Sequence, residues 1–234
     1  MNILNNKGSF VTRIAGVLLT GVVILSSCTK DDNTPTVLPA GLAISHVSPG
    51  SPEYSFKLNG TKVNIKALTY NTFNTYGALQ PGSYEFSITK KDSARVVTKS
   101  TVTLKTDQAY SVYIADVPSK ATLIVTEDDL SAPATDKAKL RFVNLSPDAG
   151  SLDLGITGKA VVFSKTDFKA STAYTSVDPG AEVGFEIKEN AGTTILATLP
   201  KVKVEKGKIY TILAKGLKAA TDSTKLALGV ITNK

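Results

Sequence analysis

The stretch LRFVNLSPD at residues 140–148 aligns with LAISHVSPG at residues 42–50, so the chain contains an internal repeat. The two stretches lie 98 residues apart, and Pro81-Gly82 and Pro179-Gly180 keep the same spacing. A period near 100 residues is longer than that of solenoid repeats and matches the length of one small β-sandwich. The repeat therefore predicts two similar modules in tandem.

Both copies alternate apolar and polar residues with the period of a β-strand. The clearest runs are residues 54–58, 84–88 and 110–114 in the first copy and 183–187 and 210–214 in the second. Turn signals such as Asn59-Gly60 and Lys206-Gly207 separate the runs, and their spacing suggests about seven strands per copy. The predicted fold class is all-β, with two tandem immunoglobulin-like β-sandwich domains after a signal peptide and a flexible tether.

Tyr110 and Tyr210 each open a late strand after a turn, and an apolar residue follows two positions on. This placement is typical of the tyrosine corner of immunoglobulin-like domains, in which the hydroxyl bonds to upstream backbone. The chain has no Trp, and its one Cys lies far from these strands. The similarity is therefore to the architecture and not to antibody domains.

Four segments of the second copy carry a family resemblance: LRFVNLSPDA at 140–149, LDL at 152–154, VDPG at 177–180 and GKIYT at 207–211. They resemble the bacterial family called domain of unknown function 4397, whose members are exported Ig-like domains, often in tandem and often lipid-anchored. The first copy departs from the pattern at Gly50, which stands where Asp148 does. The resemblance implies the fold and export from the cytoplasm, and it carries no established activity.

The N-terminus has the organisation of a secretory signal peptide. Lys7 and Arg13 precede an apolar stretch of 12 residues, IAGVLLTGVVIL at 14–25, which is too short to span a bilayer as a helix. Small residues and then Cys28, the only cysteine, follow directly. This order resembles the lipobox of bacterial lipoproteins, which implies removal of residues 1–27 and acylation of Cys28, with palmitate among the acyl groups.

Lys30, Asp31 and Asp32 follow the acylated position. They resemble the signal that sends lipoproteins to the cell surface in Bacteroidetes-type bacteria, and the alternative is an ordinary charged tether. The resemblance implies a lipid-anchored protein of the outer membrane that faces the cell surface. The predicted segments are the signal peptide at 1–27, the tether at 28–41, the first sandwich at 42–128, a linker at 129–138 and the second sandwich at 139–234.

The composition argues against several classes of function. The formal charge of +7 comes from 27 basic and 20 acidic residues without a basic cluster, so no nucleic-acid partner is expected. The chain has one histidine, His46, and its one cysteine is expected to be lipidated, so Ser-His-Asp and Cys-His catalytic arrangements lack support. A zinc site built from Cys and His is excluded by count. His46 aligns with Asn144, so we expect it to hydrogen-bond a loop. The protein is predicted to be no enzyme and to carry no cofactor besides the lipid on Cys28.

Two groups of residues remain as candidate ligand sites. Glu127, Asp128, Asp129 and Asp136 cluster around the linker and form a weak Ca²⁺ candidate, with a solvated charged linker as the alternative. Phe73 aligns with Ser171 and is not needed by the common fold, so it is a candidate glycan contact. Tyr70 and Tyr76 align with the aromatic residues Phe168 and Tyr174 and are expected in the core.

The leading hypothesis is a non-catalytic, lipid-anchored cell-surface protein with a structural or adhesive, protein-binding role. The alternative is a glycan-binding accessory lipoprotein of a polysaccharide-uptake system. Envelope proteins or glycans are the expected partners, besides the membrane that holds the lipid. The glycan hypothesis requires Phe73 to be exposed, whereas the structural hypothesis expects a buried ring and no concave pocket.

Overall fold

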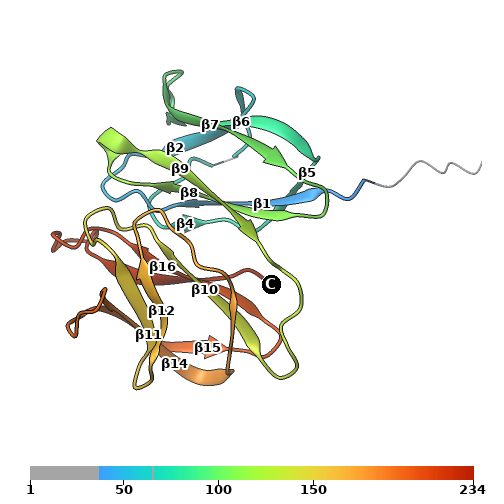
Figure 1. The fold of residues 1–234 in the computed structure, drawn as a ribbon. Coiled ribbons are helices and arrows are strands. Elements are labelled where there is room, and N and C mark those ends of the chain that lie inside the picture. The colour runs from blue at the N-terminus through green and yellow to red at the C-terminus, as the bar shows by residue number, and fades with distance from the viewer. Residues whose placement is uncertain (1–36, 65) are drawn as a thin grey trace, which may run out of the picture. The chain divides into compact units, whose positions relative to one another are not determined.

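The computed structural model describes residues 37–64 and 66–234 (Figure 1). Cys28 and the Lys30-Asp31-Asp32 segment lie outside the described residues. Strands make up 55% and helix 2% of the structure, which confirms the all-β class. The described helix is the single turn η1 (Pro118–Lys120), and no helix in this part of the chain has the length and apolarity needed to cross a membrane.

The first sandwich consists of two sheets, and the central pair of one sheet is parallel. This sheet has the order β4 (Thr72–Phe73), β1 (Ala40–His46), β8 (Ala109–Ala115), β9 (Thr122–Asp128), and β5 (Gly77–Leu79) also pairs with β1. The other sheet has the order β3 (Thr61–Lys62), β2 (Tyr54–Leu58), β6 (Gly82–Lys90), β7 (Val96–Leu104).

The second sandwich repeats this arrangement. One sheet has the order β13 (Thr175–Val177), β10 (Ala138–Asn144), β16 (Ile209–Lys215), β17 (Ala227–Thr232). The other has the order β12 (Val161–Thr166), β11 (Leu152–Ile156), β14 (Gly180–Glu189), β15 (Ile195–Val204). Strand β1 begins two residues earlier than the sequence predicts, and β10 begins in the last position of the predicted linker.

The strand registers follow the sequence repeat. Leu42 pairs with Tyr110 between β1 and β8, and Leu140 pairs with Tyr210 between β10 and β16. The backbone N–H of Lys105 donates to the Tyr110 hydroxyl at 3.1 Å, and that of Glu205 donates to the Tyr210 hydroxyl at 3.0 Å. Each copy therefore has the predicted tyrosine corner, which satisfies a backbone donor five residues upstream.

The predicted hairpin at Asn59-Gly60 joins β2 to β3. Leu58 pairs with Thr61 across a two-residue turn, and Asn59 and Gly60 have φ angles of 47° and 81°. Two consecutive positive φ angles define the turn whose twist suits a tight hairpin, and Asn-Gly adopts it at the lowest steric cost.

The alternating apolar residues fill one core in each sandwich. Phe56, Phe86 and Val112 are buried in the first core, and Phe142, Ile187 and Ile212 are buried in the second. These positions lie on the strand faces that the period of two assigns to the interior. The alternation therefore predicts the two cores correctly.

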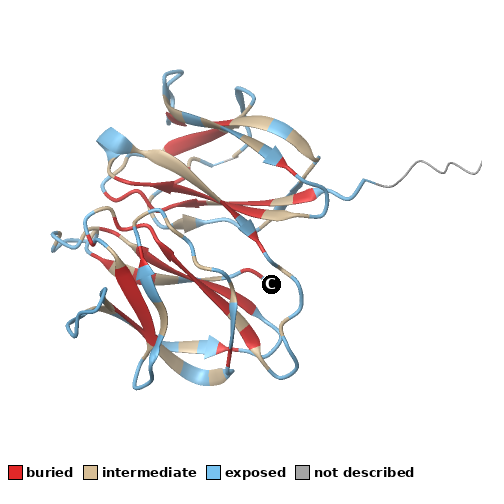
Figure 2. Ribbon diagram, viewed as in Figure 1, coloured by how far each residue is buried: buried red, intermediate tan, exposed pale blue. Residues whose placement is uncertain are grey.

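A third buried cluster joins the two sandwiches, and the alternation pattern does not predict it. It combines Val47, Tyr113 and Ala115 of the first sandwich with Val143, Leu145 and Leu213 of the second. Figure 2 shows β1, β8, β10 and β16 as largely buried strands, because their outer faces are covered as well as their inner ones. Residues 37–234 accordingly form one compact unit.

Candidate functional site at the interface of the two sandwiches

A buried ion pair lies at the edge of the third cluster. An Arg141 terminal nitrogen on β10 lies 2.6 Å from Oδ1 of Asp128, the last residue of β9, and their side chains are 1% and 0% exposed. Removing two charges from water costs several kcal/mol per ion unless their remaining hydrogen-bonding groups are satisfied. The pair therefore depends on the polar groups around it.

The Arg141 guanidinium is satisfied from both sandwiches. Its Nε donates to Thr211 Oγ1 at 2.9 Å, and one terminal nitrogen donates to the Tyr113 hydroxyl at 3.1 Å. The other donates to the backbone carbonyl of Glu127 at 3.3 Å. The guanidinium also lies 4.8 Å from the centre of the Tyr174 ring, at cation–π distance. These contacts hold Arg141 in a fixed position across the interface.

The Asp128 carboxylate accepts three further hydrogen bonds. Tyr76 and Ser111 donate to Oδ2, the latter at 2.5 Å, and Thr126 donates to Oδ1 at 3.1 Å. Burial and the nearby Asp128 carboxylate raise the pKa of Tyr76, so its hydroxyl stays a donor at neutral pH. Asn233 of the second sandwich donates to the Tyr76 hydroxyl at 2.9 Å and so extends the network across the interface.

The residues of this network occupy equivalent positions in the two repeats. At the two positions that carry a charge in one repeat, the other repeat has an uncharged residue. Tyr76 aligns with Tyr174 at the 98-residue offset, and at the same offset Ala43 aligns with Arg141. Glu127 pairs with Tyr110 as Thr232 pairs with Tyr210, which makes Asn233 the counterpart of Asp128. The Arg141–Asp128 network therefore contains one cation and one anion, and their repeat counterparts are an alanine and an amide.

A slot of about 250 Å³ opens beside this network, between β1 and β4 of the first sandwich and β17 of the second. Ala43, Ser45, Phe73, Tyr76, Val230 and Asn233 are among its lining residues, and none of the residues that line it is charged. Ser45 is only 3% exposed and contributes a hydroxyl group to the lining. The slot therefore combines apolar walls with uncharged polar groups.

A reversal of side-chain size accounts for the slot. Ser45 pairs with Phe73 between β1 and β4, and Val143 bridges Ser171 at the equivalent place of the second sandwich. The large residue lies on the central strand in the second sandwich, where it fills the third cluster. In the first sandwich the small Ser45 occupies that place and leaves space between the sheets.

Phe73 is 38% exposed at the rim of the slot, as the glycan hypothesis requires. The buried ring and the absence of a concave pocket that the structural hypothesis expects are not found. Tyr70 and Tyr76 were expected in the core, but neither is fully buried. Tyr76 is half-buried and belongs to the interface network, and Tyr70 is half-buried with Lys215 Nζ 5.6 Å from its ring centre. The three aromatic residues therefore do not form one flat platform.

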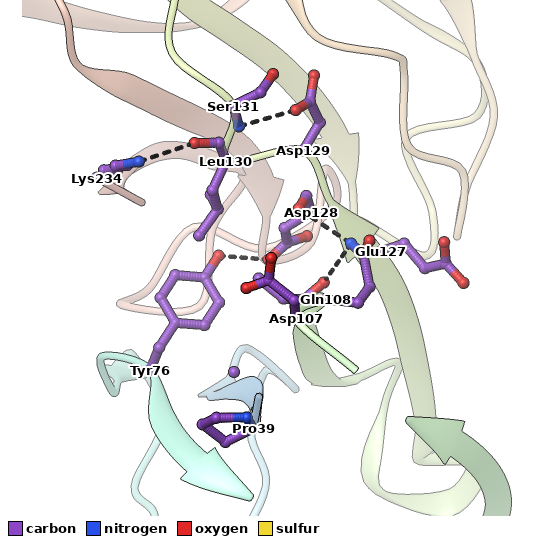
Figure 3. Close-up of a pocket in the computed structure, with 12 residues that line it drawn as sticks. Pro39, Tyr76, Asp107, Gln108, Glu127, Asp128, Asp129, Leu130, Ser131 and Lys234 are labelled. Carbon is purple, nitrogen blue, oxygen red and sulfur yellow. Dashed lines mark hydrogen bonds between the residues drawn. The ribbon is translucent and has the colours of Figure 1, made fainter. Parts of the chain in front are cut away.

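Tyr76 also lines a wider groove of about 850 Å³ (Figure 3). In this view the Tyr76 hydroxyl points to Asp128, and Lys234 Nζ donates to the Leu130 carbonyl oxygen at 3.1 Å. Asp107, Glu127 and Asp129 also line the groove. Its rim is therefore acidic, unlike that of the slot.

The carboxylates of the Ca²⁺ candidate each have a different cationic partner. Asp128 pairs with Arg141, and the other three pairs are Glu127 with Lys105 at 2.8 Å, Asp129 with Lys139 at 2.7 Å and Asp136 with Lys206 at 3.5 Å. Hydrogen bonds from Lys139 and Ser131 lower the pKa of Asp129 to about 2. In residues 37–64 and 66–234 no three potential ligands come together as a metal site, so the structure does not group these acids.

His46 and Asn144 have equivalent roles in their loops. The backbone N–H of Ser48 donates to His46 Nδ1 at 3.3 Å, and that of Ser146 donates to Asn144 Oδ1 at 3.1 Å. His46 is fully buried, and this burial lowers its pKa. The predicted loop-bonding role matches these contacts.

Arg141 is the residue that sequence reasoning missed. It lies in LRFVNL, the stretch that defines the repeat, between Leu140 and Phe142. A charge between two apolar residues, at the position where the first copy has Ala43, was the available signal. Its partner Asp128 was singled out, but as a calcium ligand.

Comparison with known proteins identifies one family. Residues 40–155 match the family described as domain of unknown function (DUF4397), which confirms the resemblance. The match covers the first sandwich and the beginning of the second, although the motif is more complete in the second copy. Among curated proteins, none matches the chain.

Several solved structures share partial similarity. The C-terminal domain of AlgF from P. aeruginosa is 21% identical with a TM-score of 0.32, covering 42% of this chain and 99% of its own. A family 26 carbohydrate-binding module of Eubacterium rectale Amy13K is 12% identical with a TM-score of 0.27 over 83% and 97% of the two chains. A putative cell adhesion protein of Bacteroides fragilis is 11% identical with a TM-score of 0.22 over 83% and 98%. These TM-scores are below 0.5, so we draw no functional inference from the similarities.

Proposed function

This chain belongs to the DUF4397 family over residues 40–155, and from that premise we propose that it is a non-catalytic, lipid-anchored cell-surface protein. Its role is structural or adhesive, with the two sandwiches acting as a single arm. The observation that carries the proposal is the buried Arg141–Asp128 pair at the edge of the shared third cluster.

The interface supports an arm because it limits movement between the sandwiches. Domains joined by small polar interfaces usually move relative to one another, whereas apolar interfaces hold them together. Here six fully buried apolar residues from both sandwiches form a cluster beside a satisfied ion pair. Separating the sandwiches would expose the cluster and leave two charges without partners, so one orientation is favoured.

The arm is tested by distance measurements between the sandwiches. Spin labels on Val96→Cys and Ile195→Cys, at exposed and equivalent positions of the two copies, report their separation in the full-length protein in detergent. A narrow distance distribution that broadens when Arg141→Ala is added supports the proposal. A broad distribution in the otherwise unchanged protein contradicts it.

The anchor follows from Cys28 and its preceding apolar stretch. One acyl chain binds a membrane only marginally, and two or more hold it stably. Cys28→Ala is therefore expected to abolish labelling by a palmitate analogue and to release the protein from the membrane fraction. Cys28→Ser serves as a control of similar size, and undiminished labelling in either variant rules out the anchor.

Surface exposure is tested separately from lipidation. Replacement of Lys30, Asp31 and Asp32 by alanine is expected to protect the protein from protease added to intact cells, with palmitate labelling kept. Wild-type protein on the same cells is the control. Equal digestion of both proteins contradicts the export role of these three residues.

A glycan-binding accessory role is the second candidate. Phe73 supports it, because a ring that is 38% exposed beside a slot with uncharged polar groups is available to a ligand. In this case the arm would present the slot at the cell surface.

A further inference from the structure

The slot occupies the position in the first repeat that the Arg141 side chain occupies in the second. Arg141 lies over the Tyr174 ring and contacts Thr211 of its own sandwich and Asp128 of the other. The counterparts of these three residues are Tyr76, Ser111 and Asn233, and all three line the slot. Ala43, the counterpart of Arg141, also lines it and contributes only a methyl group.

The slot differs from the arginine site in charge. Asn233 is the counterpart of Asp128, the acid that binds the Arg141 cation, so the slot has an amide where the arginine site has a carboxylate. No residue that lines the slot is charged. An ionic ligand entering the slot would lose hydration without gaining an opposite charge, which costs several kcal/mol. The slot therefore favours an uncharged ligand.

The lining supplies apolar surface and hydrogen-bonding groups together. Phe73 and Val230 are each 38% exposed and stand at the rim. Ser45 is 3% exposed and adds a hydroxyl to the lining. Asn74 and Thr75 add an amide and a second hydroxyl. Such a mixture suits a ring with an apolar face and hydroxyl edges, because buried polar groups require partners.

The volume sets the size of the ligand. Pockets for drug-sized molecules have volumes of about 300–1,000 Å³, and the slot of about 250 Å³ lies just below this range. One sugar ring fits this space, whereas a longer oligosaccharide would extend over the rim.

We propose that the slot between the two sandwiches binds one uncharged sugar residue of a glycan, with its ring against Phe73 and Val230. This inference rests on the glycan-binding candidate above and assigns that candidate a site and a ligand class. Both sandwiches contribute to the site, so neither repeat alone could form it.

Binding of the full-length protein in detergent to immobilised polysaccharides tests the proposal. The probes are uncharged hexose polymers and uronic-acid polymers, measured against blank surfaces. We expect binding to at least one uncharged polymer and at least tenfold weaker binding to the uronic-acid polymers. Phe73→Ala is expected to weaken binding at least tenfold, and Ser45→Val to do the same by filling the slot.

Val230→Ala is a further test variant, and Val96→Ala is its matched control. Both remove an exposed valine from a strand, but Val96 lies on β7 away from the slot, so only Val230→Ala should weaken binding. Thermal unfolding of each variant checks that its fold persists. If Phe73→Ala unfolds, Phe73→Leu replaces it, because leucine keeps apolar volume and removes the aromatic face.

Three results would overturn the proposal: no binding to any uncharged polymer, preference for the uronic-acid polymers, or binding that Phe73→Ala and Ser45→Val leave unchanged. The arm and anchor experiments do not depend on the slot. If their expected outcomes hold while no glycan binds, the slot proposal and the glycan-binding candidate are both wrong and the arm stands. If a glycan binds but Phe73→Ala and Ser45→Val leave its binding unchanged, only the slot is wrong.

Discussion

The two sandwiches share a frame and differ on the faces that they turn toward each other. At equivalent positions the first copy has Ala43 and Ser45 on its central strand, whereas the second has Arg141 and Val143. The second copy thereby supplies the buried cation and an apolar side chain to the interface, and the first copy leaves a slot. The two copies share the residues that build each sandwich core. They differ on the sheet faces that meet at the interface between the sandwiches.

The largest effect is expected from breaking the buried charge pair, to which the second copy contributes Arg141 and the first contributes Asp128. Arg141→Ala leaves Asp128 buried without a cation, which should lower the free energy of unfolding by about 3–5 kcal/mol. Denaturant unfolding followed by circular dichroism measures it. Lys105→Ala, which removes an exposed pair with Glu127, is the control and should cost far less, because water screens exposed ion pairs. Equal losses in both variants would mean that the buried pair is as weak as a surface pair.

The second largest effect on the free energy of unfolding is expected at Val143 and its counterpart Ser45, which differ in size. Val143→Ser removes a fully buried apolar side chain from the third cluster and should cost about 2–3 kcal/mol. Ser45→Val, the reciprocal change, places an apolar side chain in the slot and should shift stability by less than about 1.5 kcal/mol. The same denaturation assay compares them. A larger loss from Ser45→Val would show that the slot lacks room for the side chain found at its counterpart.

The tyrosine corners should respond alike in the two copies. Tyr110→Phe and Tyr210→Phe each remove the acceptor of one backbone N–H, and each should cost about 1 kcal/mol. Tyr210 also donates to the Lys203 carbonyl oxygen at 3.3 Å, so its loss should be slightly the larger. Thermal unfolding of the two single variants measures the difference. A large cost in only one copy would contradict equivalent roles.

The smallest effect is expected where His46 is replaced by the residue of its counterpart. His46→Asn keeps an acceptor for the Ser48 N–H and should change stability by less than about 1 kcal/mol at pH 8. Burial lowers the His46 pKa below its usual 6.5, so the unfolded chain takes up a proton that the folded chain does not. Stability from the neutral ring is complete above about pH 6.5 and is lost as the pH falls. The variant should therefore lose less stability between pH 8 and pH 5.

The carboxylates with lowered pKa values provide a common background for this comparison. Asp129, Asp153 and Asp178 also destabilise the fold as they become protonated in acid, but they are the same in both proteins. Subtracting the two pH profiles isolates the histidine. Identical profiles would mean that His46 does not contribute to the pH dependence.

Most of the frame was predictable because its signals are local. Phe56, Phe86 and Ile187 alternate with polar neighbours, and that period specifies which strand face is buried. Asn59-Gly60 specifies a two-residue hairpin through its positive φ angles. The repeat strengthened these predictions, since each strand predicted in one copy supported the prediction of its counterpart in the other.

The interface was not predictable in the same way. Period-two reasoning assigns a strand one buried face, but the parallel central strands of both sandwiches are covered on two. Tyr113 and Leu213 therefore pack in a cluster that no alternation reveals. Asp128 was recognisable as one of several neighbouring acids, whereas its distinction from Asp129 and Asp136 depends on its burial against Arg141.

The amino-acid sequence by itself determined the all-β class, the repeat, the two inner cores and the tyrosine corners, because these depend on residue periodicity and turn chemistry within short segments. Its N-terminal pattern also supplies the prediction of a lipid anchor on Cys28. Only the tertiary structure decided which outer faces meet, which acid is paired with Arg141 and where Ser45 leaves a slot beside Phe73. Those features arise from contacts between two sandwiches, and their energies depend on burial and charge pairing that exist only after the sandwiches have docked.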